Sequence, residues 1–220
     1  MALHNDRGEL HPLLQSMVTK YPELEACMPD VEAALAKLTD TYRQGGKTLV
    51  CGNGGSASDS EHIVGELMKG FMSKRPLSPE ERNRFAELFP EDAEFLANHL
   101  QGALPAISLV SHSALMTAYI NDVSAEMVFA QQVYGYGKKG DTLIGLSTSG
   151  NSANVVRAMQ VAKTLGLTTI ALTGSSGGKL RDLCDITIRV PWESTPDIQE
   201  RHLPIYHALC RLLEEAFFPS

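Results

Sequence analysis

The sequence has 220 residues, of which 43% are hydrophobic and 20% are charged, an ordinary globular composition that is large enough for one substantial core. The formal net charge of −7 argues against a nucleic-acid partner, which would require a basic face. No apolar run approaches the roughly 18 residues of a membrane span, and the opening MALHNDRGELHPLL lacks the basic-then-apolar pattern of a secretion signal.

The four cysteines lie far apart in the sequence, at Cys27, Cys51, Cys184 and Cys210, and no two of them form a CxxC pair. This spacing favours free thiols in a reducing compartment over a disulfide framework or a zinc ribbon. We therefore expect a soluble, cytoplasmic, single-domain protein spanning residues 1–220, with no membrane partner.

The N-terminal helices are predicted within residues 8–44, where polar and apolar residues alternate at helical spacing. Pro29 stands where a second helix would open, and the glycines at 45–46 would end it. Two such helices before the first strand predict a helical hairpin or arm.

Five short apolar runs follow, separated by helical stretches such as residues 151–166. Apolar strands that alternate with helices predict an α/β fold with a parallel sheet covered on both faces. A long C-terminal helix is predicted over 196–217, with Pro204 able to kink it or delay its start. The predicted strands are residues 48–51, 106–109, 142–146, 168–172 and 186–190.

Residues 73–104 interrupt this alternation between the first helix and the second strand. SPEE at 78–81 is a capping box with proline at the first helical position. We expect two short helices, at about 80–88 and 91–101. The insertion acts as a lid or subunit contact, or it is a surface excursion without chemistry.

Two loops at strand ends carry the strongest chemical signals, because ligands of open α/β sheets bind there. The first strand ends in GNGGS at 52–56, with Ser58 or Asp59 placed to cap the next helix. The third ends in STSGNS at 147–152, again before a helix. One hydroxyl suffices for a cap, so four in six residues predict a phosphate site at a helix N-terminus. A P-loop is disfavoured, because no G-K-[ST] follows the glycines.

Four segments together resemble the sugar isomerase (SIS) domain family, and within it the sedoheptulose-7-phosphate isomerase branch. The segments are CGNGGSASDSEHIVGEL, GLSTSGNSANVVRAM, ALTGSSGGKL and DIQERHLPIYHAL. The resemblance covers residues 30–217 apart from the insertion. It implies a three-layer α/β/α sandwich with a five-stranded parallel sheet, and a homotetramer with active sites at subunit interfaces.

The resemblance also implies roles for individual residues, some of which serve two purposes. The implied phosphate cradle is Ser147, Thr148, Ser149 and Ser152. The implied sugar contacts are Asn53, Gly54, Gly55, Ser56, Asn121, Asp122 and Gln199. The implied zinc ligands are His62, Glu66, Gln199 and His207. The sequence departs from the family at Pro196-Asp197, where a small or acidic residue followed by a basic one is expected.

The spacing within the zinc set agrees with helix geometry. His62 and Glu66 at i, i+4 share one helix face, and Gln199 and His207 at i, i+8 lie close to two turns apart. Singly, the His–Glu pair is typical of a solvated helix face, and His207 of a hydrogen-bonded core histidine. Because the glycine loop and the hydroxyl loop are present in the same sequence, a functional site is favoured over these structural roles.

A ketose–aldose isomerase that converts sedoheptulose 7-phosphate to D-glycero-D-manno-heptose 7-phosphate must move a proton from C1 to C2 through an enediol. We expect Glu66 to carry that proton and His207 to move protons between oxygens. Zinc would polarise the carbonyl, yet a carboxylate held tightly by zinc is a poor base. His99, His112 and His202 are expected to be structural or exposed.

Three other functions stay open at this point. One is a non-catalytic SIS protein that binds a replication-initiation partner, which we expect to lack the full His/Glu/Gln/His set. Another is an isomerase for a different phosphosugar, since the insertion could reshape the pocket. The third is a sugar-phosphate sensor, disfavoured because no helix-turn-helix precedes the fold.

Overall fold

The computed structural model describes residues 10–219 and contains a five-stranded parallel sheet in the order β2-β1-β3-β4-β5. Strand β2 lies on one side of β1, and strands β3, β4 and β5 follow one another on the other side. The direction in which strands are added to the sheet therefore reverses between β1 and β3, and ligands of open α/β sheets bind at such a point. The predicted strands are confirmed as Thr48–Gly52 (β1), Ala106–Ser108 (β2), Thr142–Leu146 (β3), Thr168–Thr173 (β4) and Ile186–Arg189 (β5).

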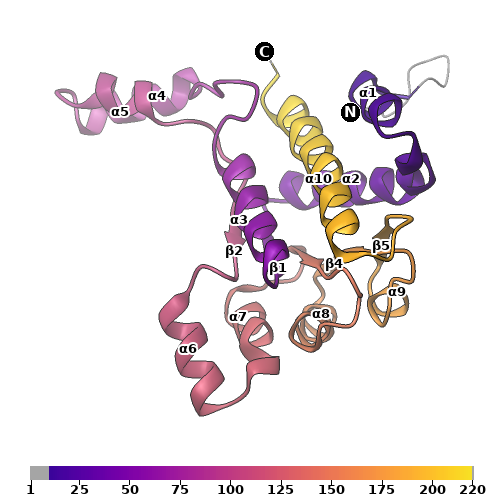
Figure 1. The fold of residues 1–220 in the computed structure, drawn as a ribbon. Coiled ribbons are helices and arrows are strands. Elements are labelled where there is room, and N and C mark those ends of the chain that lie inside the picture. The colour runs from indigo at the N-terminus through magenta and orange to yellow at the C-terminus, as the bar shows by residue number, and fades with distance from the viewer. Residues whose placement is uncertain (1–9, 220) are drawn as a thin grey trace.

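Helices cover both faces of the sheet, which confirms the three-layer α/β/α architecture (Figure 1). Alternation along β1 divides the core, because Val50 packs into one cluster while Leu49 and Cys51 pack into the other. One layer contains Met28–Arg43 (α2), Gly55–Met68 (α3) and Thr195–Phe217 (α10). The other contains Val128–Tyr136 (α7), Ala153–Leu165 (α8) and Leu180–Leu183 (α9).

The N-terminal helices pack onto this body. Pro12–Lys20 (α1) leads through a 3-10 turn at Pro22–Cys27 (η1) into α2. Leu14 and Leu24 are fully buried in the cluster that also contains the apolar residues of α10. The predicted helical segment is therefore present from residue 12 onward, and residues 8 and 9 lie outside the described residues.

The long C-terminal helix α10 begins at Thr195, so Pro204 inside it does not delay its start. Burial raises the pKa of Cys27 to about 11 and those of the other three cysteines to about 12, and all four thiols are free, as predicted. Within residues 10–219, no helix is long and apolar enough to cross a membrane.

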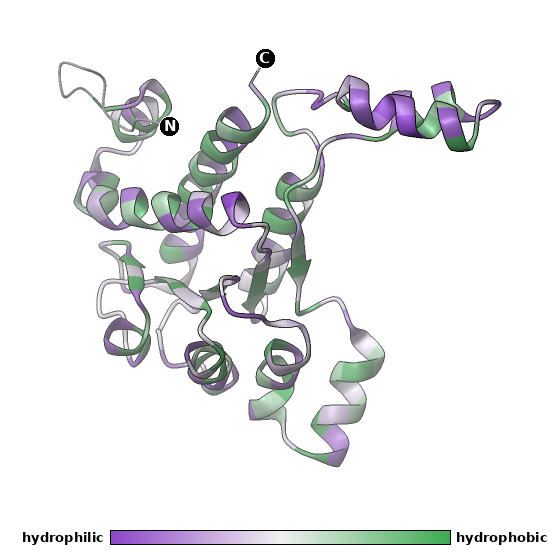
Figure 2. Cartoon of the chain, turned by 180° about the vertical axis from the view of Figure 1, so that it is seen from behind, coloured by the Kyte–Doolittle hydropathy of each residue, from purple (hydrophilic) through white to green (hydrophobic). Residues whose placement is uncertain are grey.

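The insertion forms two helices that project from the body as an arm (Figure 1). Pro79–Leu88 (α4) opens with the predicted capping box, in which the Ser78 backbone N–H donates to Glu81 Oε2 at 2.9 Å. Ala93–His99 (α5) is shorter than the predicted 91–101. Figure 2 shows green hydrophobic bands among purple ones along this arm.

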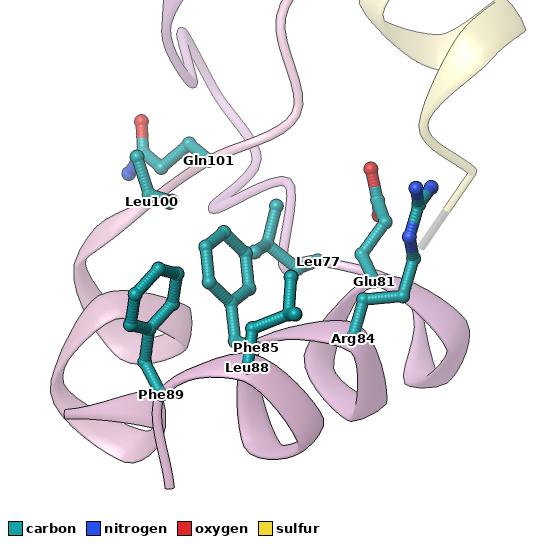
Figure 3. Close-up of a pocket in the computed structure, with 8 residues that line it drawn as sticks. All are labelled: Leu77, Glu81, Arg84, Phe85, Leu88, Phe89, Leu100 and Gln101. Carbon is teal, nitrogen blue, oxygen red and sulfur yellow. The ribbon is translucent and has the colours of Figure 1, made fainter. Parts of the chain in front are cut away.

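A cavity of 380 Å³ lies on the arm, against α4 and the segment at residues 100–101 (Figure 3). Its walls are mainly apolar, with Phe85 and Phe89 beside Leu77 and Leu100. It lies away from the ends of the strands, so it is not the site that the two loops predict.

Candidate functional site

The glycine loop brings backbone close to its neighbours where β1 passes into α3. A Cβ added to Gly52 would lie 2.5 Å from the Ser56 carbonyl oxygen, and one on Gly55 would lie 2.7 Å from Gln199 Nε2. The helix begins at Gly55 with Gly54 as its N-cap at φ +57°. The prediction that Ser58 or Asp59 caps the helix is wrong, since both lie inside it and the glycines let it start earlier.

The hydroxyl loop at residues 147–152 precedes α8, where the helix dipole favours an anion. Ser147 Oγ and Ser152 Oγ are 2.9 Å apart, and Ser149 Oγ accepts from the Asn151 N–H at 3.2 Å. Ser152 occupies the N-cap position, yet its side chain accepts no capping hydrogen bond from the helix. Thr148 Oγ1 lies 3.5 Å from Thr195 Oγ1 at the start of α10. These hydroxyls therefore gather at one helix N-terminus without being used up as caps.

An amide pair joins the glycine loop to the first turn of α8. Asn53 Nδ2 donates to Asn154 Oδ1 and Asn154 Nδ2 donates to Asn53 Oδ1, both at 2.9 Å. Asn53 was predicted to face the sugar, whereas Asn154 was not predicted to take part. The pair holds the loop that follows β1 against the start of the helix that follows β3.

A His–Glu–His cluster lies between α3 and α10. His62 Nε2 is 3.2 Å from Glu66 Oε1 and 3.4 Å from His207 Nε2. Glu66 is 8% exposed, and its second oxygen, Oε2, accepts from Lys69 Nζ at 3.2 Å. Burial lowers the pKa of His207, and the charges of His62 and Arg211 lower it further. A neutral His207 at neutral pH is able both to accept and to donate a proton.

Gln199 is not brought to this cluster. Its amide lies against Gly55, seven residues before His62 on α3, which corresponds to about 10 Å along the helix. In the part of the chain that the structure describes, no group of three or more His, Cys, Asp or Glu side chains is arranged to hold a metal ion. His62 contacts both Glu66 and His207, but these side chains do not close around one point.

Asn121 and Asp122 end Ser113–Asp122 (α6), which extends from the body beyond α7 (Figure 1). Asn121 Nδ2 donates to Asp122 Oδ1 at 2.8 Å, and both residues are exposed. No residue of α6 is buried. Within the described chain, neither residue has a recorded hydrogen bond to the two loops, so their predicted sugar contacts stay a prediction.

Sequence reasoning missed two residues behind His62. The Tyr206 hydroxyl donates to Asp59 Oδ1 at 3.1 Å and lies 3.1 Å from His62 Nδ1. Burial and the Asp59 charge raise the pKa of Tyr206, so it keeps its proton. Because that proton goes to Asp59, the contact with Tyr206 places a proton on His62 Nδ1, and Nε2 faces Glu66 and His207. Tyr206 is adjacent to His207 and Asp59 is three residues before His62, but no motif pairs them.

His99, His112 and His202 are structural or exposed, as predicted. His99 is exposed and contacts the Phe95 carbonyl, and His112 is half-buried beside Tyr136. His202 is fully buried, with Nε2 3.3 Å from the Thr173 carbonyl oxygen, and burial lowers its pKa to about 4.

This buried histidine predicts acid sensitivity of the fold. The unfolded chain binds a proton at His202 below about pH 6.5 and the folded chain only below about pH 4, so stability falls as the pH drops through this window. We expect up to about 3 kcal/mol of unfolding free energy to be lost there. Urea denaturation from pH 7 to 4 measures this loss, and His202→Gln flattens the slope. An unchanged slope in that variant contradicts the assignment.

Comparisons with known proteins show the family to which the chain belongs. The SIS domain family model matches residues 85–174. The phosphoheptose isomerase of Rhodospirillum rubrum is 36% identical over 94% of this chain and 97% of its own length. That of Nitratiruptor is 44% identical over 78% of each chain. The structure of a phosphoheptose isomerase from Francisella tularensis superposes with a TM-score of 0.71 at 30% identity, covering 92% of this chain and 94% of the other. The chain belongs to the phosphoheptose isomerase family of SIS-domain proteins.

Proposed function

We propose that the protein interconverts sedoheptulose 7-phosphate and D-glycero-D-manno-heptose 7-phosphate. The observation that carries the proposal is the hydroxyl loop at α8, joined by the Asn53–Asn154 pair to the strand-loop-helix unit that bears His62 and Glu66. Such an arrangement offers one region for a phosphate and another for acid–base chemistry. Family membership over nearly the full length supports the same reaction.

In this mechanism the loop at residues 147–152 holds the phosphate and thereby positions the distant reacting carbons. Glu66 takes a proton from C1 of the open-chain ketose, which forms a C1–C2 enediolate, and returns it to C2. A carboxylate suits this role when it is largely buried, as Glu66 is.

His207 completes the proton balance. It gives a proton to the C2 oxygen as the enediol forms and takes one from the C1 hydroxyl as the aldehyde forms. Its lowered pKa favours a neutral ring that performs both transfers. The same ring would assist opening of the cyclic sugar.

A panel of ketose phosphates with five, six and seven carbons tests the proposal. We expect the seven-carbon substrate to give the highest kcat/KM, with NMR identifying an aldoheptose 7-phosphate as product. Turnover confined to a shorter ketose would reassign the substrate, and inactivity on all members would favour a binding protein.

We also propose zinc as the metal of this site, with His62, Glu66, Gln199 and His207 as its ligands. The two measured separations, 3.2 and 3.4 Å, lie near the roughly 3.3 Å between ligand atoms in a tetrahedral zinc site. Zinc would polarise the substrate carbonyl as a Lewis acid. Since the described side chains do not converge and Gln199 lies apart, no step above is assigned to the metal.

Zinc retention is expected to depend on His62. His62→Ala should weaken zinc binding by about tenfold or more, because it removes the residue that both other side chains contact. Metal content after dialysis, measured by mass spectrometry, reports this loss, with His99→Ala as the control on the exposed arm. Equal zinc in both variants would contradict the ligand set.

We further propose a homotetramer, supported by apolar side chains left exposed on α6 and on the segment that follows it. Leu115, Ile120 and Val123 are 39%, 47% and 61% exposed. A partner subunit that covered these side chains would bring Asn121 and Asp122 to an active site at the subunit interface. We expect sedimentation to give a tetramer, and Ile120→Asp to shift it to smaller species. A monomeric wild-type protein would contradict this.

A further inference from the structure

Arg75 stands out among the buried residues at the root of the arm. Its side chain is 0% exposed, and its φ of +44° makes it the one non-glycine residue with positive φ between residues 10 and 219. Such a conformation costs about 1–3 kcal/mol and persists only where the surroundings enforce it. The contacts of its side chain must therefore stabilise a backbone conformation that is unfavourable for arginine by itself.

The guanidinium of Arg75 binds the end of helix α3. Nη2 donates to the Glu66 carbonyl oxygen at 2.9 Å and Nη1 to the Leu67 carbonyl oxygen at 2.8 Å. The last carbonyls of a helix lack partners within it, and the residue after α3, Lys69, is extended. Arg75 thus caps the turn that carries the proposed base, Glu66, through its backbone.

The third bond of Arg75 reaches helix α10. Nε donates to Glu214 Oε1 at 2.7 Å, and Glu214 is 2% exposed. Burial alone would raise the pKa of Glu214, but hydrogen bonds from the Phe71 and Met72 N–H groups and from Arg75 outweigh it and lower that pKa. Glu214 stays ionised and lies seven residues, about two turns, beyond His207 on α10.

We propose that Arg75 and Glu214 are positioning residues that set Glu66 against His207. The pair joins the last turn of α3 to α10 through bonds of 2.7 to 2.9 Å, so the two helices that supply the reacting groups share one rigid connection. The inference rests on the proposed roles of Glu66 and His207. Misplacement of a reacting group by about 1 Å lowers the catalytic rate by about 100-fold. The connection through Arg75 and Glu214 prevents such a misplacement of Glu66 relative to His207.

The decisive variant is the double substitution Arg75→Met with Glu214→Leu. Removing one partner alone leaves an unpaired buried charge, whereas removing both avoids that charge and leaves only neutral backbone groups, among them the Phe71 and Met72 N–H groups, without these partners. We expect a cooperatively folded enzyme whose kcat falls by about tenfold or more while KM stays within about twofold. A lower kcat with an almost unchanged KM indicates that Glu66 is misplaced, because the hydroxyl loop that binds the phosphate at the start of α8 is not altered.

Two further variants complete the test. Arg75→Lys keeps the charge opposite Glu214 but cannot bond Glu214 and both carbonyls at once, so its kcat should also fall even if the double variant fails to fold. Arg82→Met is the matched control, because Arg82 donates to the Ala97 carbonyl on the arm at 3.2 Å, and its kcat should match the wild type.

Wild-type kcat in a folded double variant, or in Arg75→Lys, overturns the inference. Measuring Glu66→Gln in parallel distinguishes failure of the positioning role of Arg75 and Glu214 from failure of Glu66 as the proposed base. An inactive Glu66→Gln with an unaffected double variant rejects only the positioning role, whereas an active Glu66→Gln rejects the proposed base itself.

Discussion

Glu66→Gln is expected to lower kcat by about 10³-fold while the protein stays folded. The amide has the shape of the carboxylate but cannot take a proton from carbon, and loss of a general base costs about 10²–10⁴ in rate. Glu66 contacts His62 and Lys69 at the edge of the cluster, and Gln retains an oxygen for one of them. The loss is measured with sedoheptulose 7-phosphate, and folding is measured by thermal denaturation.

The control for this variant is Glu61→Gln on the same helix. Glu61 is exposed and accepts a hydrogen bond from Ser111 Oγ at 2.9 Å, away from the histidine cluster. Its kcat should match the wild type. Full turnover by Glu66→Gln would show that another group moves the carbon-bound proton.

Gly150→Ala is expected to raise KM for the phosphosugar by about 100-fold and to lower the free energy of unfolding by about 3 kcal/mol. Gly150 has φ +66°, and a Cβ there would lie 2.0 Å from the Gly177 carbonyl oxygen. Both the backbone strain and the clash must be relieved by moving the hydroxyl loop or the loop at Gly177. Displaced hydroxyls no longer meet the phosphate together.

Substrate kinetics and urea denaturation measure the two effects of Gly150→Ala. Gly135→Ala is the matched control, because Gly135 lies in α7 with negative φ and open space around its Cβ position. That change should leave KM unaltered and stabilise the helix by up to about 1 kcal/mol. An unaltered KM in Gly150→Ala would place the phosphate elsewhere.

Much of the fold could be predicted because its signals are local. Each strand is a short apolar run, and the five runs alternate with helices, so the sheet and its two helical layers follow from periodicity. The His62–Glu66 pair likewise follows from one turn of a single helix. The capping box at Ser78 is local too, and the structure contains it.

The connections between helices could not be predicted, since they join residues that are distant in sequence. Arg75 and Glu214 are 139 positions apart, and Tyr206 meets Asp59 across 147. Spacing along one helix also leaves the distance along its axis to be considered. Gln199 and His207 lie about 12 Å apart along α10, and in this structure the Gln199 amide lies against Gly55.

Three of the four thiols are buried and the fourth, Cys184, is half-buried, so the native cysteines of this enzyme are poorly reactive. With pKa values of about 11 to 12, they hold almost no thiolate at neutral pH, and thiolate is the form that reacts with maleimides and disulfides. A cysteine introduced at exposed Glu91, on the arm between α4 and α5, would have an ordinary pKa and react far faster than the native four. A single fluorophore can therefore be attached to the arm without removal of any native cysteine.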